Sequence, residues 1–386
     1  MKIRAITIGV EPGRPLNVRQ IAAACAFAQQ LKTRYEEAGV PVQTVRLATP
    51  PFPTYLSDAT HEAVLRFARD LEHCSREHGI DYCALGPVNP GVEAEKRFLD
   101  GLPALIAGTE AVFVSACLGK GHQLVHREAL RAVARVVQQI ARITSEGFGN
   151  LRFAAVVNCP PAVPFFPVAF HEGAPAFSLA LQAADIVALV CTPDKEMDEL
   201  GLALRQELET RLLPIQRIAQ REAEYGFVFR GIDLSPAPGP APEESIAYAI
   251  EQLGVGRFGE PGTLAAAACI TAALQETSLQ TCGYCGLMLP VLEDAGLAER
   301  NEQGVLQVSN LLAYSAVCGT GLDTIPLPGD VSEAQLTALL FDVAALGWRL
   351  RKPLSARLLP VPGKRAGEYT QFTFPYFVNT KVMAIR

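Results

Sequence analysis

Four ionisable residues lie at or beside predicted strands, where a folded chain presents side chains to a ligand. Asp233, Glu293 and Asp323 each adjoin a short apolar run, and His171 lies in the loop that follows another. Several carboxylates near one histidine suit proton transfer between positioned acids and bases, or a hard cation that polarises a substrate oxygen. We take these four residues as the predicted catalytic set, assign no metal ligands, and leave hydrolysis and elimination both open.

The clearest of these signals is the stretch at residues 226–242, GFVFRGIDLSPAPGPAP. Residues 227–232 suit a strand, and the prolines from Pro236 onward cannot donate to a sheet ladder. We therefore expect the strand to end there and to deliver Asp233 and Ser235 to the end of the sheet, where α/β folds bind ligands. The alternative is that Asp233 only caps backbone amides of a turn.

Seven more polar residues form the predicted substrate-binding set. Glu172 and Asp294 are sequence neighbours of two catalytic residues. Thr263 ends a glycine-rich loop before an alanine-rich helix expected from Leu264, whose N-terminal amides favour an anion. In the alternative interpretation, Asp294 and Asp323 only satisfy buried amides and the helix start is only a tight entry turn. The full set is Asn158, Glu172, Ser235, Glu260, Thr263, Asp294 and Cys318.

Apolar runs that suit strands alternate with segments of helical periodicity, which is typical of an α/β fold. We expect one large domain over residues 1–386, with a pseudo-division near residues 150–225. Asn17 is a predicted helix N-cap, and Ser332 with Gln335 forms a predicted capping box. The main predicted strands are residues 2–10, 41–48, 81–85, 111–117, 153–158, 183–191, 227–232, 287–292 and 355–360, and a long predicted helix at 194–223 is interrupted at Pro214.

Composition narrows the class of protein. The 386 residues are 49% hydrophobic and 19% charged, with a formal net charge of -6 and basic residues spread along the chain, so we expect no nucleic acid partner. We also expect no membrane span and no signal peptide. Ten scattered cysteines suit reduced thiols in the cytoplasm. The expected partner is a small molecule, while a divalent cation as cofactor and a homo-oligomer both stay open.

Six blocks of the sequence resemble, in the same order, the uncharacterised proteins grouped as domain of unknown function 711, also called uncharacterised protein family 0210. The resemblance extends from one end of the chain to the other. The blocks are IRAITIGV (3–10), VAFHEG (168–173), GIDLSPAPGPAPEESIAYAIEQLG (231–254), PGTLAAAACI (261–270), CGLMLPVLEDAGL (285–297) and CGTGLDTIPLPGD (318–330).

That family resembles pyruvate formate-lyase and other glycyl-radical enzymes in fold. The resemblance implies a ten-stranded α/β barrel built from two parallel half-barrels. It does not imply radical chemistry, because the radical glycine of those enzymes lies in an Arg-x-x-Gly-Tyr run and residues 365–369 here read RAGEY. The adjacent cysteine pair of those enzymes is also absent, and only Cys318 could correspond to the barrel cysteine.

Two departures from the family pattern fall on predicted site residues. Where relatives commonly read Ala-Phe-His-Gly, Glu172 is added after His171. Where they commonly read His-Gly-Thr-Thr, residues 260–263 read EPGT, so a histidine is lost and Glu260 is gained nearby. The residues and the resemblance together predict a non-radical enzyme that acts on a small polar metabolite by acid/base chemistry inside the barrel. The alternatives are a small-molecule-binding regulatory protein without turnover and a metal-dependent enzyme that uses the same carboxylates.

Overall fold

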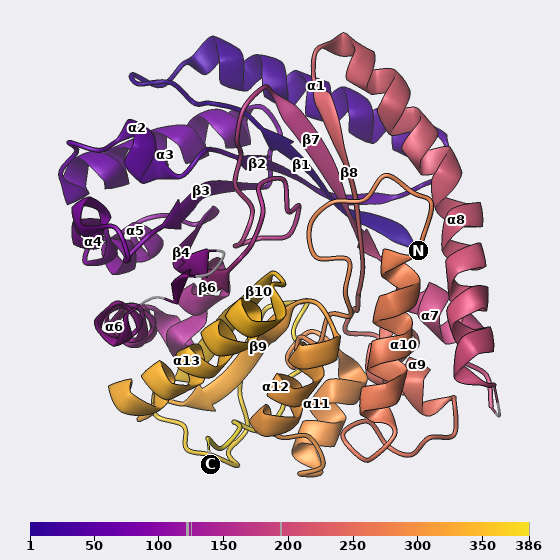
Figure 1. Cartoon of the computed structure of the whole chain (residues 1–386). Helices are drawn as coiled ribbons and strands as arrows, with labels where there is room; N and C mark the ends of the chain where they lie inside the picture. The colour runs from indigo at the N-terminus through magenta and orange to yellow at the C-terminus, as the bar shows by residue number, and fades with distance from the viewer. Residues whose placement is uncertain (121–122, 125, 194, 386) are drawn as a thin grey trace.

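One curved sheet forms the centre of the structure, and helices surround its outer side (Figure 1). The computed structural model describes residues 1–120, 123–124, 126–193 and 195–385. The strands are β1 (Lys2–Gly9), β2 (Val42–Ala48), β3 (Tyr82–Val88), β4 (Val112–Lys120), β5 (Gln123–Leu124), β6 (Phe153–Val157), β7 (Ala176–Gln182), β8 (Val228–Ala237), β9 (Gly321–Pro328) and β10 (Leu354–Val361).

The helices follow the strands in alternation along most of the chain. They are α1 (Val18–Glu37), α2 (Phe52–Tyr55), α3 (His61–Glu77), α4 (Glu93–Leu99), α5 (Leu102–Ala107), α6 (Arg127–Ile143), α7 (Ala184–Val190), α8 (Met197–Glu222), α9 (Ile246–Glu251), α10 (Thr263–Gln275), α11 (Ala295–Glu302), α12 (Val308–Val317) and α13 (Glu333–Leu350), with 3-10 turns η1 (Ser145–Arg152), η2 (Ala223–Tyr225) and η3 (Pro242–Glu244). Among the described residues, no helix has the length and apolarity needed to span a bilayer.

The sheet is mixed and open. Among the described residues, nine strands pair along one path, in the order β8-β7-β1-β2-β3-β4-β6-β10-β9, and β5 pairs only with β4. Strands β1, β2, β3, β4 and β6 are parallel to one another. The parallel pairs β7–β8 and β10–β9 join them through antiparallel contacts at β1 and β6. An α/β fold is therefore confirmed, whereas the closed ten-stranded barrel is not, because no ladder in the described part of the chain joins β8 to β9.

Residues 281–290 lie between the two edge strands of this path. Thr281 forms an isolated parallel bridge with Ile232 of β8, and Pro290 forms one with Asp323 of β9. The segment thus contacts both edges but contains no regular strand, so the predicted strand at 287–292 is wrong. Its backbone turns too often for a ladder, with positive φ at Gly283 (72°) and Cys285 (45°).

Two other predicted elements also need correction. Residues 183–191, expected as a strand, form helix α7, and the strand of that region is β7, immediately before it. A short apolar run does not distinguish a buried strand from a buried helix. Helix α8 continues through Pro214 without interruption, because buried leucines spaced four residues apart, such as Leu204 and Leu208, hold it against the core.

Strand β8 is longer than predicted and includes Asp233, Ser235 and Pro236. The two polar residues are therefore inside the sheet and not beyond its end. A proline is tolerated there because β8 is an edge strand of the path and its outer side needs no ladder donor. The predicted caps are confirmed: Asn17 accepts a hydrogen bond from the Gln20 amide, and the capping box begins α13.

The two faces of the sheet have different surroundings. On β2, Val45 and Leu47 belong to the large core cluster between the sheet and its helices, while Thr44 and Arg46 line a cavity on the opposite face. Small inward residues such as Ala5 leave room on that inner face for loop segments. The 158–175 loop (magenta) and the 281–290 segment fill part of the space inside the curve (Figure 1).

Candidate functional site

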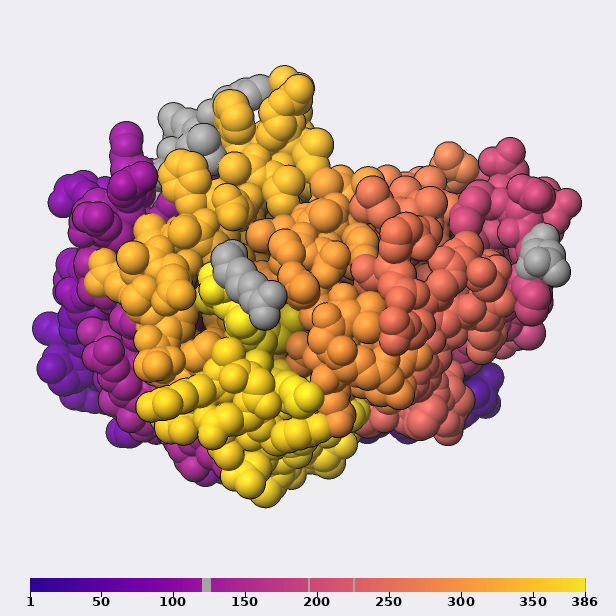
Figure 2. All heavy atoms as spheres, turned by 90° about the horizontal axis from the view of Figure 1, so that it is seen from below, coloured from indigo at the N-terminus to yellow at the C-terminus, as the bar shows by residue number. Residues whose placement is uncertain are grey.

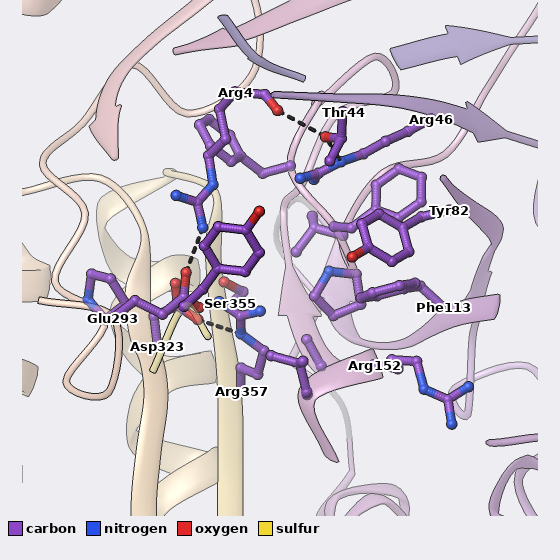
Figure 3. Close-up of a pocket in the computed structure, with 18 of the residues that line it drawn as sticks. Arg4, Thr44, Arg46, Tyr82, Phe113, Arg152, Glu293, Asp323, Ser355 and Arg357 are labelled. Carbon is purple, nitrogen blue, oxygen red and sulfur yellow. Dashed lines mark hydrogen bonds and ion pairs between the residues drawn. The ribbon is translucent and has the colours of Figure 1, made fainter. Parts of the chain in front are cut away.

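A cavity of about 220 Å³ opens on the inner face of the sheet, where strands from both halves of the chain present charged and aromatic side chains (Figure 3). We call it the arginine cavity. Its wall comprises Arg4, Gln43, Thr44, Arg46, Tyr82, Glu110, Phe113, Phe148, Leu151, Arg152, Ala154, Phe165, Phe166, Pro167, Val168, Tyr284, Met288, Pro290, Glu293, Asp323, Ser355, Arg357, Phe374 and Tyr376.

A buried ion cluster forms one side of the arginine cavity. Arg357 of β10 donates from Nε to Asp323 Oδ1 at 2.6 Å and from Nη2 to Glu293 Oε1 at 2.7 Å. Arg4 of β1 donates to the other oxygen of Glu293, Oε2, at 2.5 Å. The side chains of Arg357, Glu293 and Asp323 are all buried, so these charge-assisted hydrogen bonds are only weakly screened by water.

The two carboxylates of this cluster differ in whether one oxygen lacks a hydrogen-bond partner. Both oxygens of Glu293 accept hydrogen bonds from arginines, whereas Asp323 Oδ2 accepts none from the described residues. Burial raises the pKa of Asp323, and this effect exceeds the opposing attraction of Arg357. Burial also favours the neutral form of Glu293, but Arg357 and Arg4 outweigh it and lower the pKa of that carboxyl. The environment thus shifts the two acids in opposite directions.

Arg46 occupies the opposite wall of the cavity. Its Nε donates to the Thr44 hydroxyl at 2.9 Å, and its Cζ lies 5.2 Å from the Phe166 ring centroid and 5.7 Å from that of Tyr82. Only 8% of the residue is exposed, and no carboxylate among the described residues lies within ion-pair distance of it. Burial, reinforced by the nearby charge of Arg4, lowers the pKa of Arg46 to about 10.

The C-terminal segment closes one end of the cavity. Phe374 and Tyr376 line the wall, and Phe374 packs against Phe148 with ring centroids 5.3 Å apart. Figure 2 shows this segment (yellow) lying over one face of the molecule, between the parts coloured purple and orange. The aromatic end and the charged side together make a small pocket with one polar and one apolar region.

Comparison with known sequences identifies the family. The sequence model of the family described as "Uncharacterised ACR (DUF711)" matches residues 1–373. The chain belongs to this family. It is 32% identical to a "UPF0210 protein" of Desulforudis audaxviator over 404 residues, which cover 96% of this chain and 88% of that protein. A "UPF0210 protein" of Methanopyrus kandleri is 30% identical over 400 residues, covering 95% of this chain and 88% of the relative.

A third relative, a "UPF0210 protein" of Pyrobaculum arsenaticum, is 30% identical over 398 residues, which cover 96% of this chain and 87% of that protein. These names give no substrate and no reaction. The chemistry of this UPF0210 chain must therefore be inferred from its own residues.

Of the four predicted catalytic residues, the structure brings together only Glu293 and Asp323. His171 lines a separate hollow of about 550 Å³, formed by Pro160, Pro161, Ala162, His171, Glu172, Arg230, Thr281, Cys282, Gly283 and Cys285. Its Nε2 lies 2.9 Å from the Gly173 carbonyl oxygen, and burial lowers the pKa of the ring. Glu172 is exposed at the rim of the same hollow.

Asp233 is fully buried and supports the turn that separates the two hollows. It accepts hydrogen bonds from the amides of Tyr284 (2.8 Å), Cys285 (3.0 Å) and Ser235 (3.1 Å), and from the Ser235 hydroxyl at 2.7 Å. Burial raises the pKa of Asp233, against these hydrogen bonds. Ser235 in turn accepts from the Gly286 amide at 3.1 Å. Because Tyr284 lines the arginine cavity, Asp233 positions part of its wall.

The remaining predicted binding residues hold local structure. Asp294 is the N-cap of α11 and accepts from the Gly296 and Leu297 amides. Its second oxygen accepts from the Ile246 amide at 2.7 Å. Thr263 accepts from the Gly259 amide at 3.0 Å where α10 begins, and Glu260 pairs with Arg257 on the surface.

Asn158 and Cys318 also lie outside the arginine cavity. Asn158 donates from Nδ2 to the Gly347 carbonyl at 2.9 Å and so connects the end of β6 to α13. Cys318 is fully buried in the main core, and burial raises the pKa of its thiol to about 11. The binding and catalytic roles assigned to all these residues stay predictions; what the structure gives is their place.

Three arginines of the cavity were missed by the sequence reasoning. Arg4, Arg46 and Arg357 each stand within an otherwise largely apolar strand, as in LSARLLPV of β10. A charged residue at one position of a buried strand is an unfavourable placement unless it has a partner or a function. That signal is readable in the sequence, but it does not say that three distant strands meet at one cavity.

Proposed function

We propose that this chain is a non-radical enzyme that acts on a small polar metabolite by acid/base chemistry in the arginine cavity, in a hydrolysis or an elimination. The observation that carries the proposal is the Oδ2 atom of Asp323, a carboxylate oxygen without a hydrogen-bond partner among the described residues, in a carboxyl whose pKa is raised by burial. A carboxyl of raised pKa within a closed pocket suits a general acid that also returns as a base.

The other members of the cluster have supporting roles in this proposal. Glu293 stays ionised between Arg4 and Arg357 and keeps both guanidinium groups in place. Arg357 holds Asp323 through Nε and so fixes the direction in which Oδ2 points. A carboxyl held in this way loses little orientational freedom when it transfers a proton.

The position of Gly367 supports a proposal without radical chemistry. Gly367, the glycine of the RAGEY run, lies on the exposed surface and donates its amide to the Val382 carbonyl at 2.9 Å. It does not line the arginine cavity. Buried free thiols such as Cys25 and Cys83 further support a reducing compartment, which we take to be the cytoplasm.

We extend the proposal to the architecture. In the suggested ten-position barrel of the pyruvate formate-lyase type, residues 281–290 take the position between β8 and β9. The parallel bridges at Thr281 and Pro290 support this assignment, as does the antiparallel joining of two parallel groups of strands. An arginine cavity inside such a barrel would be shielded from bulk water on most sides.

A divalent cation fits this cavity poorly. Among the described residues no group of three or more histidine, cysteine, aspartate or glutamate side chains is arranged to hold a metal ion. Glu293 and Asp323 are already paired with guanidinium groups, which would repel a second cation. We therefore route no step through a metal.

A regulatory binding protein without turnover is the second candidate. The observation in its favour is that both oxygens of Glu293 already accept hydrogen bonds from guanidinium groups, which lower the pKa of this carboxyl and make it a weak base. Both candidates place the ligand in the same cavity, so the presence of turnover separates them.

The test is a consumption assay. Purified protein is incubated with a library of small metabolites and the mixture is analysed by mass spectrometry, with D323N and, as a matched control, D330N at an exposed position. We expect at least one compound to be consumed by the wild type and by D330N, about 100-fold more slowly by D323N, and equally in excess EDTA. Loss of ligand binding in D323N would make Asp323 a binding group, and binding without consumption would favour the regulatory protein.

A further inference from the structure

Arg46 is the one cavity arginine whose two Nη groups both lack a hydrogen-bond partner among the described residues. Arg4 and Arg357 each pair with Glu293, and Arg357 also pairs with Asp323. Arg46 uses Nε for the Thr44 hydroxyl and leaves both Nη groups without a hydrogen bond to the described residues. A buried charge without a partner is costly, so such a group indicates a ligand of opposite charge.

The charges around the cavity agree with this interpretation. Four arginines and three acids line the wall, which leaves one positive charge in excess. Two of these groups are engaged outside the ion cluster. Glu110 pairs with Arg76, and Arg152 donates to the carbonyls of Ile106 and Val112, with its guanidinium group pointing away from the centre (Figure 3). The other three arginines and two acids still leave one positive charge in excess. The excess therefore belongs to Arg46, whose side chain extends inward from β2 (Figure 3).

We propose that Arg46 binds the carboxylate of the substrate through its two Nη groups, so that the substrate is a small organic acid with a flat or apolar body. This inference rests on the proposed function only in calling the ligand a substrate. A guanidinium fork matches the two oxygens of a carboxylate. While Asp323 is ionised, as it is when it acts as a base, a single negative charge also balances the excess, whereas a phosphate monoester brings close to two at neutral pH.

The size and lining of the cavity indicate what the rest of the ligand is like. Its volume of about 220 Å³ is below the ~300 Å³ at which drug-sized pockets begin, so it fits a small metabolite and not a nucleotide. Eight of the wall residues are aromatic, and two of them, Tyr82 and Phe166, flank the Arg46 guanidinium. An acid held there places its apolar body among rings and its reacting atoms near the ion cluster of Asp323.

The test compares acids with their uncharged amides. Benzoate and benzamide, and 4-methylpentanoate and 4-methylpentanamide, are titrated by calorimetry into the wild type, R46M, R46K and the control R205M, which removes an equal charge from the surface of α8. Inorganic phosphate is a further probe. We expect each acid to bind the wild type at least tenfold more tightly than its amide, and R46M to lose that difference while the amides change less than threefold.

R46K adds a measurement that does not depend on losing the buried charge. It keeps a cation but not the planar fork, so its affinity for the acids is expected to lie between those of the wild type and R46M. R205M is expected to bind as the wild type does. The proposal is overturned if acids and amides bind equally, if no acid binds, if phosphate binds more tightly than the acids, or if R46M keeps its preference.

Failure of this inference and failure of the proposed enzyme give different results. Binding of the probe acids that depends on Arg46, without consumption of any compound in the metabolite library, keeps the carboxylate site and removes the enzyme. Turnover of a neutral compound that is unaffected by R46M keeps the enzyme and removes the carboxylate site.

Discussion

The variant R357M tests how the buried cluster holds the arginine cavity together. Arg357 makes two hydrogen bonds to charged partners, to Asp323 at 2.6 Å and to Glu293 at 2.7 Å. Each such bond contributes about 1.5–3 kcal/mol, and breaking a buried ion pair by removing one partner typically costs about 3–5 kcal/mol. We therefore expect the free energy of unfolding, measured with urea and circular dichroism, to fall by about 3–5 kcal/mol.

The loss in R357M is expected to depend on pH in a defined direction. Without the guanidinium, two neighbouring buried carboxylates have pKa values above those of the unfolded chain, so the folded state binds protons more readily than the unfolded state. Stability then falls as pH rises, and the deficit relative to the wild type should shrink between about pH 7 and pH 5. The double variant R357M/D323N, which keeps the pair between Glu293 and Arg4 and removes the unpaired aspartate, should recover part of the loss.

R211M provides the control for this measurement. Arg211 pairs with Glu207 on the exposed side of α8, where such a pair contributes only about 0.3–0.5 kcal/mol. A loss in R357M no greater than that in R211M, or one that does not change with pH, would refute the account of the cluster.

Three further predictions concern residues outside the cluster. D233N should lower the free energy of unfolding by about 2–3 kcal/mol in urea, because the carboxylate accepts four hydrogen bonds; unchanged stability would contradict its structural role. Burial lowers the pKa of His171, so the stability that its neutral ring contributes is present above about pH 6.5 and is lost as the pH falls. On acidification, the melting temperature of H171Q should therefore fall less than that of the wild type. An equal decrease in both proteins would exclude that assignment. G283A should cost about 2–5 kcal/mol, because a Cβ at Gly283 meets the Asp233 carboxylate, whereas G254A, with a similar φ and open space, should cost only about 1–2 kcal/mol; equal denaturation midpoints would contradict this difference.

The sequence predicts local structure better than it predicts the pairing of distant segments. The caps at Asn17 and Ser332 are confirmed because each depends on residues within one helical turn. The run at residues 183–191 misleads because a helix and a strand buried on all sides have similar composition. The path of nine strands depends on contacts between residues far apart in the chain, which periodicity does not encode.

The same difference between local signals and distant contacts applies to the candidate site. Glu293 and Asp323 were predicted from their positions at strands, and the structure brings both to one guanidinium. Asp233 has a similar local signal, but both of its oxygens accept hydrogen bonds within the fold, which only the three-dimensional contacts reveal. Arg46 was missed because an isolated arginine in a strand gives no indication of its partners until the strands are placed.

The most direct test of the central claim separates binding from turnover for one consumed acid. The account predicts that R46M raises the KM of that acid at least tenfold and changes kcat less than threefold, whereas D323N lowers kcat about 100-fold and leaves the Kd close to that of the wild type. An acid whose kcat does not depend on Asp323, or whose KM does not depend on Arg46, would contradict the account.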